Sequence, residues 1–263
     1  MSGMSWPTLL MAALPFAVGS AIQAAPQPNA PSGSSAPASD LPASGSATSK
    51  AVREAQEADE VVRRILTNKQ ANFTYPRLID AQSRALQAWL KTGMTKEMNL
   101  RRIDLASTYL TSGDLRLGKQ VAEEVLQAYR HPQAQDENVL RSSALGLAAM
   151  IASEKGEFES AIAYHRENIK IMAVLNESDP GLRIAVYSAL AQLYSALGNI
   201  SESRGLIEES KQVLMSSKGS ESTASGWAHV LLIELGILLS HGEINHAMLT
   251  LAEMGQRLGP SLS

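Results

Sequence analysis

The sequence predicts an all-α protein built as an α-solenoid, in which antiparallel helix pairs stack one on the next. Apolar residues recur at helical spacing through most of the chain after residue 50. Four helical stretches are each interrupted by a glycine, and these glycines are 43, 42 and 44 residues apart. Only 5% of the 263 residues are aromatic, which suits helices packed through Leu, Ala and Ile.

Residues 1–25 predict a signal peptide or a membrane anchor. The run "WPTLLMAALPFAVGSAIQAA" (6–25) is apolar and ends in small residues, so it resembles a secretory signal peptide cleaved after Ala24 or Ala25. The basic start of such a peptide is missing, because no Lys or Arg precedes Lys50. Cleavage predicts an exported, periplasmic protein. The alternative is a protein anchored in the membrane by residues 6–25.

Residues 26–50 predict a disordered linker. They are mostly Pro, Ala, Ser and Gly, with almost no charge and few bulky apolar side chains. Such a composition cannot bury enough apolar surface to offset the conformational entropy of the chain. The linker is therefore expected to tether the N-terminal run to a folded domain.

The folded part is predicted to begin with a divergent N-terminal helix pair over residues 51–96. The amphipathic stretches 51–68 and 77–92 form this pair, and terminal repeats commonly differ from internal ones. Four repeats follow over 97–258, with a short tail at 259–263. Asp179-Pro180 predicts a helix start, and the polar stretch 215–226 predicts a connector between helices.

Each repeat is predicted to turn at its glycine, because a residue of positive φ is needed where the first helix ends. These turn glycines are Gly113, Gly156, Gly198 and Gly242. The next residue is expected to cap the second helix or to complement its dipole; these residues are Asp114, Glu157, Asn199 and Glu243. A small residue five positions after each glycine lets the two helices approach closely; these are Gly118, Ala161, Ser203 and Ala247.

This arrangement resembles the tetratricopeptide repeat. The first repeat matches at Leu105, Ala106, Tyr109, Gly113 and Leu115, and the third at Leu190, Ala191, Tyr194 and Gly198. The second matches at Gly156, Phe158 and Ala161, and the fourth matches at Leu235-Gly236 after a shift of one residue. The resemblance implies a right-handed α-solenoid, with repeats of about 42 residues that exceed the usual 34. It also implies a concave groove that binds a protein or peptide.

The resemblance further implies that first-helix residues line this groove. In the first and second repeats these are Ile103, Asp104, Ser107, Leu110, Gly146, Leu147, Met150 and Ser153. In the third and fourth they are Ser188, Ala189, Gln192, Ser195, Ile233, Glu234 and Ile237. We expect an extended or helical peptide with apolar anchors, and carboxylates at Asp104 and Glu234 that favour a basic residue. Alternatively, the chain's own N-terminal helices partly fill this face.

The predicted helix 227–239, "WAHVLLIELGILL", is apolar nearly all round, apart from His229 and Glu234. Such a helix must be buried on more than one side, and it is too short to span a membrane. Neighbouring helices are one expected cover. A partner or a second copy of the chain, giving self-association, is the other.

No residue pattern predicts catalysis, a metal or a cofactor. The chain has no cysteine, no nucleophile elbow and no glycine-rich phosphate loop. His241 and His246 are five residues apart with a turn between them, which is the wrong spacing for a zinc motif. The net charge of −3 and the pI of about 6.0 argue against binding to nucleic acid.

The sequence therefore predicts a non-enzymatic protein-binding scaffold of the cell envelope, which helps to assemble an envelope complex. One alternative is a cytosolic or membrane-anchored regulatory or sensor module. A second alternative is an all-α enzyme, which would need an acid, base or nucleophile constellation that the sequence does not display.

Overall fold

The computed structural model describes residues 44–67, 73–175, 180–217 and 221–258. The predicted signal peptide or anchor, residues 26–43 of the predicted linker, Asp179 and the predicted tail lie outside the described residues. Within the described ranges there are ten α-helices and no strand, so the all-α prediction is confirmed. No helix in these ranges combines the length and the apolar character needed to cross a membrane.

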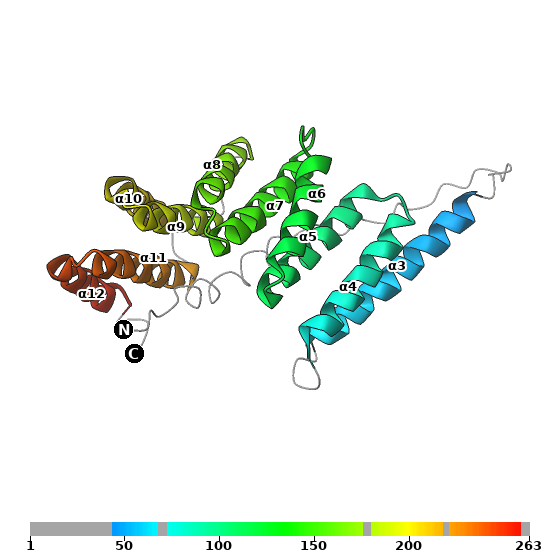
Figure 1. The fold of residues 1–263 in the computed structure, drawn as a ribbon, viewed down its shortest axis with the longest axis horizontal. Coiled ribbons are helices and arrows are strands. Elements are labelled where there is room, and N and C mark those ends of the chain that lie inside the picture. The colour runs from blue at the N-terminus through cyan, green and yellow to red at the C-terminus, as the bar shows by residue number, and fades with distance from the viewer. Residues whose placement is uncertain (1–43, 68–72, 176–179, 218–220, 259–263) are drawn as a thin grey trace, which may run out of the picture. The chain divides into compact units, whose positions relative to one another are not determined.

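The chain divides after Ile151 into two compact units. The N-terminal unit holds α3 (Ser44–Thr67), α4 (Tyr75–Leu90), α5 (Thr95–Ser112), α6 (Leu115–Ala128) and most of α7 (Gln135–Glu154) (Figure 1). Within it, α4 packs on α3 and on α5, and α5 packs on α6.

The C-terminal unit holds α8 (Phe158–Val174), α9 (Pro180–Ala196), α10 (Ile200–Ser216), α11 (Glu221–Ser240) and α12 (Ile244–Leu258) (Figure 1). Helix α9 packs on α8, α10 and α11, and α11 packs on α10 and α12. Pro180 is the first residue of α9, as predicted, because its fixed φ suits the first helical position. Successive helix pairs therefore bury their faces against one another, which is the predicted solenoid principle.

Two helices begin at least six residues earlier than the sequence predicts. Helix α3 begins at Ser44, seven residues before the predicted start, so residues 44–50 of the predicted linker are helical. An i,i+4 ion pair between Lys50 and Glu54, at 3.8 Å, supports this first part of the helix. Helix α11 begins at Glu221, inside the predicted connector 215–226.

The first part of α11 approaches α10 closely at Gly226. A Cβ added at Gly226 would lie only 2.6 Å from Cδ2 of Leu214, so the start of α11 lies tightly against the end of α10.

All four predicted turn glycines have positive φ. The φ angles are 86° at Gly113, 73° at Gly156, 79° at Gly198 and 73° at Gly242. At the last three turns the same two backbone hydrogen bonds close the helix: the glycine N–H donates three residues back, and the next N–H donates five residues back. Gly93, between α4 and α5, also has a positive φ of 72°, which the sequence analysis did not predict.

Small residues lie where the helices of a pair approach most closely, as predicted. A Cβ added at Gly118 would lie 3.2 Å from Cδ1 of Ile151 and 3.3 Å from the carbonyl oxygen of Ala106. Ser203 is fully buried, and its hydroxyl donates a 2.7 Å hydrogen bond to the carbonyl oxygen of Ala191. Ala161 and Ala247 are also buried at the corresponding positions.

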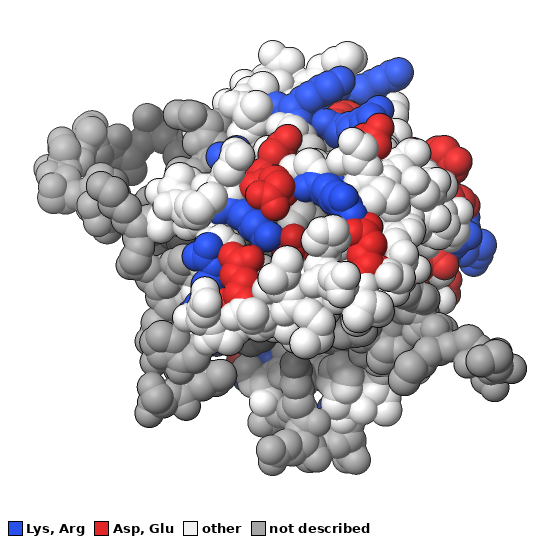
Figure 2. Space-filling view, turned by 90° about the vertical axis from the view of Figure 1, so that its left-hand side faces the viewer, with Lys and Arg blue, Asp and Glu red and all other residues white. Residues whose placement is uncertain are grey.

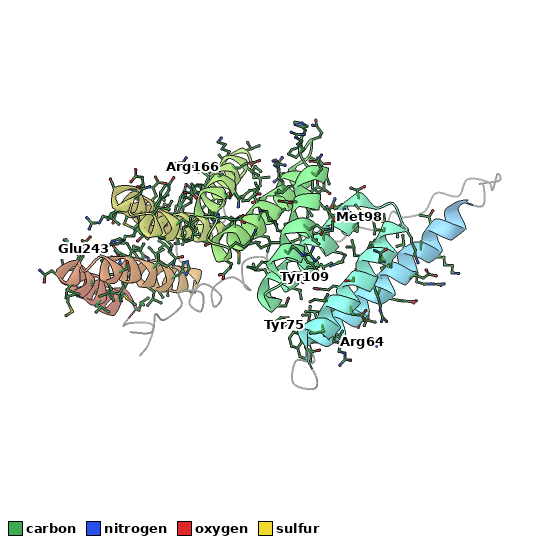
Figure 3. The ribbon with its side chains drawn as sticks, in the orientation of Figure 1. Arg64, Tyr75, Met98, Tyr109, Arg166 and Glu243 are labelled. Atoms are coloured by element: carbon green, nitrogen blue, oxygen red, sulfur yellow. The ribbon has the colours of Figure 1, made fainter. Side chains whose placement is uncertain are left out.

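The predicted capping role is confirmed at one of the four positions. The carboxylate of Asp114 accepts a 3.1 Å hydrogen bond from the backbone N–H of Leu117. Glu157 and Asn199 occupy the N-cap positions of α8 and α10 without a side-chain capping bond. Glu243, labelled in Figure 3 near the start of α12, instead forms ion pairs with Arg204 and His246.

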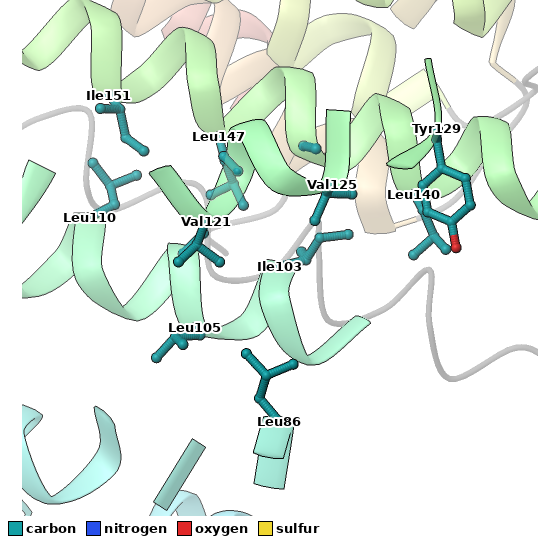
Figure 4. Close-up of a cluster of buried hydrophobic side chains, with 13 residues drawn as sticks. Leu86, Ile103, Leu105, Leu110, Val121, Val125, Tyr129, Leu140, Leu147 and Ile151 are labelled. Carbon is teal, nitrogen blue, oxygen red and sulfur yellow. The ribbon is translucent and has the colours of Figure 1, made fainter. Parts of the chain in front are cut away.

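The core of the N-terminal unit is a cluster of thirteen buried apolar residues from α4 to α7 (Figure 4). Ile103, Val125 and Ile151 are its most deeply buried large side chains, at 0 or 1% exposure. Burying such residues is the main favourable contribution to folding, so this cluster fixes how α5, α6 and α7 lie together.

The C-terminal unit has two such clusters, one around α8 and α9 and one around α9, α10 and α11. Trp227, Val230 and Leu231 fill the second cluster, and the guanidinium of Arg257 lies 3.6 Å from the centre of the Trp227 ring. The predicted apolar helix 227–239 is thus buried on one side by its neighbours. Its other side is not covered, since Leu232 is 52% and Leu239 is 51% exposed.

Candidate functional site

The residues of the predicted groove are all buried or half-buried, and none is exposed. The buried ones are Ile103, Leu110, Leu147, Ser188, Ser195 and Ile237. The half-buried ones are Asp104, Ser107, Gly146, Met150, Ser153, Ala189, Gln192, Ile233 and Glu234. The half-buried residues can therefore contact a partner, whereas the buried residues mainly support the packing of the helices.

In the N-terminal unit, Asp104 belongs to a polar network that includes α3. Arg101 Nη1 lies 2.6 Å from Asp104 Oδ2, and Arg101 Nε lies 2.9 Å from Asp59 Oδ1. The indole of Trp89 donates a 2.9 Å hydrogen bond to the other oxygen of Asp59. Burial raises the pKa of Asp104, and the Arg101 charge opposes this rise. The surroundings of Asp104 are thus partly occupied by the chain's own N-terminal helix.

In the C-terminal unit, Glu234 is paired with a lysine of α10. Lys211 Nζ lies 2.8 Å from Glu234 and 3.8 Å from Glu253, which joins α10, α11 and α12. Burial acts to lower the pKa of Lys211, but the hydrogen bond to Glu234 and the nearby carboxylates outweigh it, so the pKa is raised. Neither predicted groove carboxylate is therefore unpaired, and the expected attraction for a basic residue loses its basis.

The fourth helix pair aligns with the third without the one-residue shift that the sequence match at Leu235-Gly236 required. Asn199 N–H donates to Tyr194 O and Glu243 N–H donates to Leu238 O, so the turns at Gly198 and Gly242 align 44 residues apart. Because α11 is one unbroken helix, this alignment holds along its length.

The groove positions of the fourth pair change accordingly. The residues equivalent to Ser188, Ala189 and Gln192 are Leu232, Ile233 and Gly236. Glu234 and Ile237, which the shifted alignment had placed in the groove, correspond to core positions. Ile237 is 7% exposed and belongs to the apolar cluster around α11.

The structure also brings together a serine and a histidine that the sequence analysis did not connect. Ser195 Oγ lies 2.9 Å from Nε2 of His241, across 46 residues of sequence. Among the described residues no carboxylate is hydrogen-bonded to His241, so the third group of a catalytic triad is not in place. The contact joins the end of α9 to the turn between α11 and α12.

The described residues contain no metal cluster, and the face shown in Figure 2 carries no field of one charge. In the part of the chain that the structure describes, no three His, Asp or Glu side chains are grouped so that they could hold a metal ion. The face shown in Figure 2 intersperses Lys and Arg with Asp and Glu. A surface mixed in this way lacks the continuous basic stripe that attracts nucleic acid.

Solved structures identify the fold. The chain is similar to a crystal structure from Podosopora anserina described as a putative kinesin light chain with nearly identical TPR-like repeats, at TM-score 0.61 and 17% identity over 78% of this chain and 95% of that chain. A point-substituted form of the same protein matches at TM-score 0.63 and 16% identity, over 79% and 95% of the two chains. At such identities the likeness concerns the fold alone.

No protein-family model and no curated protein matches the sequence. The fold is that of a tetratricopeptide-like helical repeat protein, as predicted.

Proposed function

We propose that this tetratricopeptide-like array is a non-enzymatic protein-binding scaffold of the cell envelope, which receives a polypeptide segment along its first helices. The observation that carries the proposal is the direct packing of the first helices α9 and α11 within the C-terminal unit. Two adjacent first helices form a continuous face on which an extended or helical segment can lie.

The residues along this face define the chemistry of the segment. Ala189, Gln192, Ile233 and Gly236 are half-buried and uncharged. Small and apolar side chains admit close approach of a peptide, and the Gln192 amide can both donate and accept a hydrogen bond. Because Glu234 is already paired with Lys211, the preferred segment carries apolar anchors rather than a basic residue.

Site-specific cross-linking tests this proposal. A photo-reactive side chain at Gln192 is expected to capture a protein from an envelope fraction of the native host. The same group at Gln212, which is exposed on the second helix α10, is the matched control. Equal capture from both positions, or a complex that survives Ala189→Arg as well as it survives Gln212→Arg, would contradict binding at this face.

The envelope location rests on the apolar run 6–25 and the Pro/Ala/Ser-rich stretch after it. Intact-mass measurement of the protein from its host tests it, since export predicts loss of about 24 residues from the N-terminus. An intact N-terminus in the membrane fraction would indicate the anchored form instead. An intact N-terminus in the soluble cytosolic fraction would contradict the envelope role and favour a regulatory module.

A further inference from the structure

The last described helix pair leaves an apolar face uncovered. This terminal face consists of Leu232, Leu235 and Leu239 on α11 and Ile244, Met248 and Leu251 on α12. Leu232 and Leu239 are 52% and 51% exposed, and the three residues of α12 are 57%, 61% and 45% exposed. Each set recurs at three- or four-residue intervals, so each forms one stripe along its helix.

The preceding helix pair shows what this face is built to do. Each residue of the terminal face lies 44 positions after a residue of α9 or α10: Ser188, Ala191, Ser195, Ile200, Arg204 and Ile207. Ala191 and Ile207 are buried in one cluster with Trp227, Val230 and Leu231 of α11. In the third pair, these positions are therefore where the next first helix docks.

The covered face of the third pair includes polar residues, whereas the exposed terminal face is entirely apolar. In the covered face of the third pair, Ser188 and Ser195 are buried, and the contacts include the Ser195–His241 hydrogen bond and the Arg204–Glu243 ion pair. In the terminal face all six equivalents are large and apolar. Large apolar side chains exposed along two adjacent helices have the composition of an interface.

We propose that the terminal face is the contact of a homodimer, in which the α11–α12 faces of two copies pack against each other about a two-fold axis. None of its six residues carries a charge, so two identical faces can meet without like-charge repulsion. The face also lacks the hydroxyl and the guanidinium with which the third pair selects His241 and Glu243. It is therefore suited to an equally apolar surface, and a second copy supplies one.

The size of the face sets the strength of the dimer. Five half-exposed large side chains and the partly buried Leu235 form a patch on the order of 500 Å². Stable interfaces bury about 800 Å² on each partner. The dimer is therefore expected to be weak and to dissociate on dilution, with a dissociation constant in the micromolar range.

Sedimentation velocity of the full chain over a wide concentration range tests the proposal. We expect a monomer–dimer equilibrium, and a dissociation constant at least tenfold higher for Met248→Glu and for Leu232→Glu. Val174→Glu is the matched control, because Val174 is an apolar residue of α8 with 74% exposure that lies outside the terminal face. A monomer at every concentration, or association that Met248→Glu and Leu232→Glu leave unchanged, overturns the proposal; the second outcome would place the contact elsewhere, for example in residues 6–25.

A spin label gives a second readout that does not depend on a destabilising charge. The chain has no cysteine, so Met248→Cys and Val174→Cys each provide one attachment site. The label at position 248 is expected to lose mobility as the protein concentration rises, whereas the label at position 174 keeps its mobility. Equal behaviour of the two labels would overturn the proposal even if the protein dimerises.

Discussion

The α5–α6 pair and the α9–α10 pair both turn at a glycine and place a small residue five positions later. The contact between the two helices of each pair, here called the seam, differs between them. At the fifth position after the turn, α6 has Gly118, beside which a Cβ would meet Ile151 and the Ala106 carbonyl oxygen at 3.2–3.3 Å. At the same position, α10 has Ser203, whose hydroxyl donates to the Ala191 carbonyl oxygen. The first seam relies on close packing of backbone and side chains, and the second adds a hydrogen bond.

Both units bury polar side chains, and those of the N-terminal unit include Gln82, Asn99 and Thr108. In the C-terminal unit, buried polar side chains such as Ser188, Ser203, Ser210, His165 and Asn168 lie among the apolar residues. A buried polar group is tolerated when it is hydrogen-bonded and is costly when it must carry an unpaired charge. Among the described residues the one buried histidine, His165, lies in the C-terminal unit, so the two units should respond differently to acid.

Acidification is expected to produce the largest difference in stability between the two units. Burial lowers the pKa of His165 to about 4 from its ordinary value of 6.5. Between these values the unfolded chain binds a proton that the folded chain does not, so stability falls as the pH drops from 6.5 to 4. At about 1.4 kcal/mol per pKa unit, the loss is about 3 kcal/mol.

Hydrogen exchange at pH 7 and pH 4.5 measures this effect in each unit. The N-terminal unit holds one histidine, His131, and its side chain is exposed rather than buried. His165→Met, which cannot be protonated, should flatten the acid response of α8 and α9. An unchanged response in that variant would show that another group carries the acid sensitivity.

Exchanging the seam residues is expected to destabilise both pairs. Gly118→Ser forces a side chain against a backbone oxygen and should cost about 2 kcal/mol. Ser203→Gly loses a hydrogen bond and some helix propensity and should cost about 1–2 kcal/mol. Urea unfolding of the two variants gives these values. If Gly118→Ser were neutral, the first seam would not be closed by packing alone.

The turn glycines are expected to behave alike in both pairs. Gly113 and Gly198 have φ angles of 86° and 79°, and nothing lies within 4 Å of an added Cβ at either position. Replacement by Ala therefore introduces only left-handed backbone strain, about 1–2 kcal/mol at each site. Thermal unfolding of Gly113→Ala and Gly198→Ala compares them, and a large difference would point to a contact beyond the turn itself.

Substitutions at the helix caps are expected to have the smallest effect on the free energy of unfolding. Asp114→Ala removes a hydrogen bond to the first turn of α6 and should cost about 1 kcal/mol. Asn199 makes no side-chain capping bond to α10, so Asn199→Ala should change the unfolding free energy by no more than a few tenths of a kcal/mol. Equal losses in urea unfolding would mean that Asn199 caps α10 after all.

Much of the fold was predictable because its signals are local. Gly156, Gly198 and Gly242 each end a helix through hydrogen bonds that reach at most five residues back. The early start of α11 was not predictable, because its first residues, Glu221 to Gly226, are polar or small and weakly helix-forming. The register of the fourth pair was missed for a related reason: a match at Leu235-Gly236 competed with the turn, and the continuous helix decides in favour of the turn.

The candidate site was less predictable than the fold. The sequence identified Asp104 and Glu234 as acidic residues of first helices, but not that Arg101 and Lys211 neutralise them. It identified the 227–239 helix as too apolar for a solvent-exposed helix, but not which stripe remains uncovered. Which residues neutralise the carboxylates and which stripe remains uncovered both depend on contacts between helices, and the loops that join the helices vary in length.

By itself the sequence determined that this chain makes glycine-turned helix pairs at an interval of 42–44 residues, because backbone conformation and helical periodicity act over short stretches of chain. Only the tertiary structure decided the pairing of Ser195 with His241, the neutralisation of Glu234 by Lys211 and the exposure of Leu232 and Met248. These features depend on how helices 20 to 50 residues apart pack together, and that packing is a property of the whole unit.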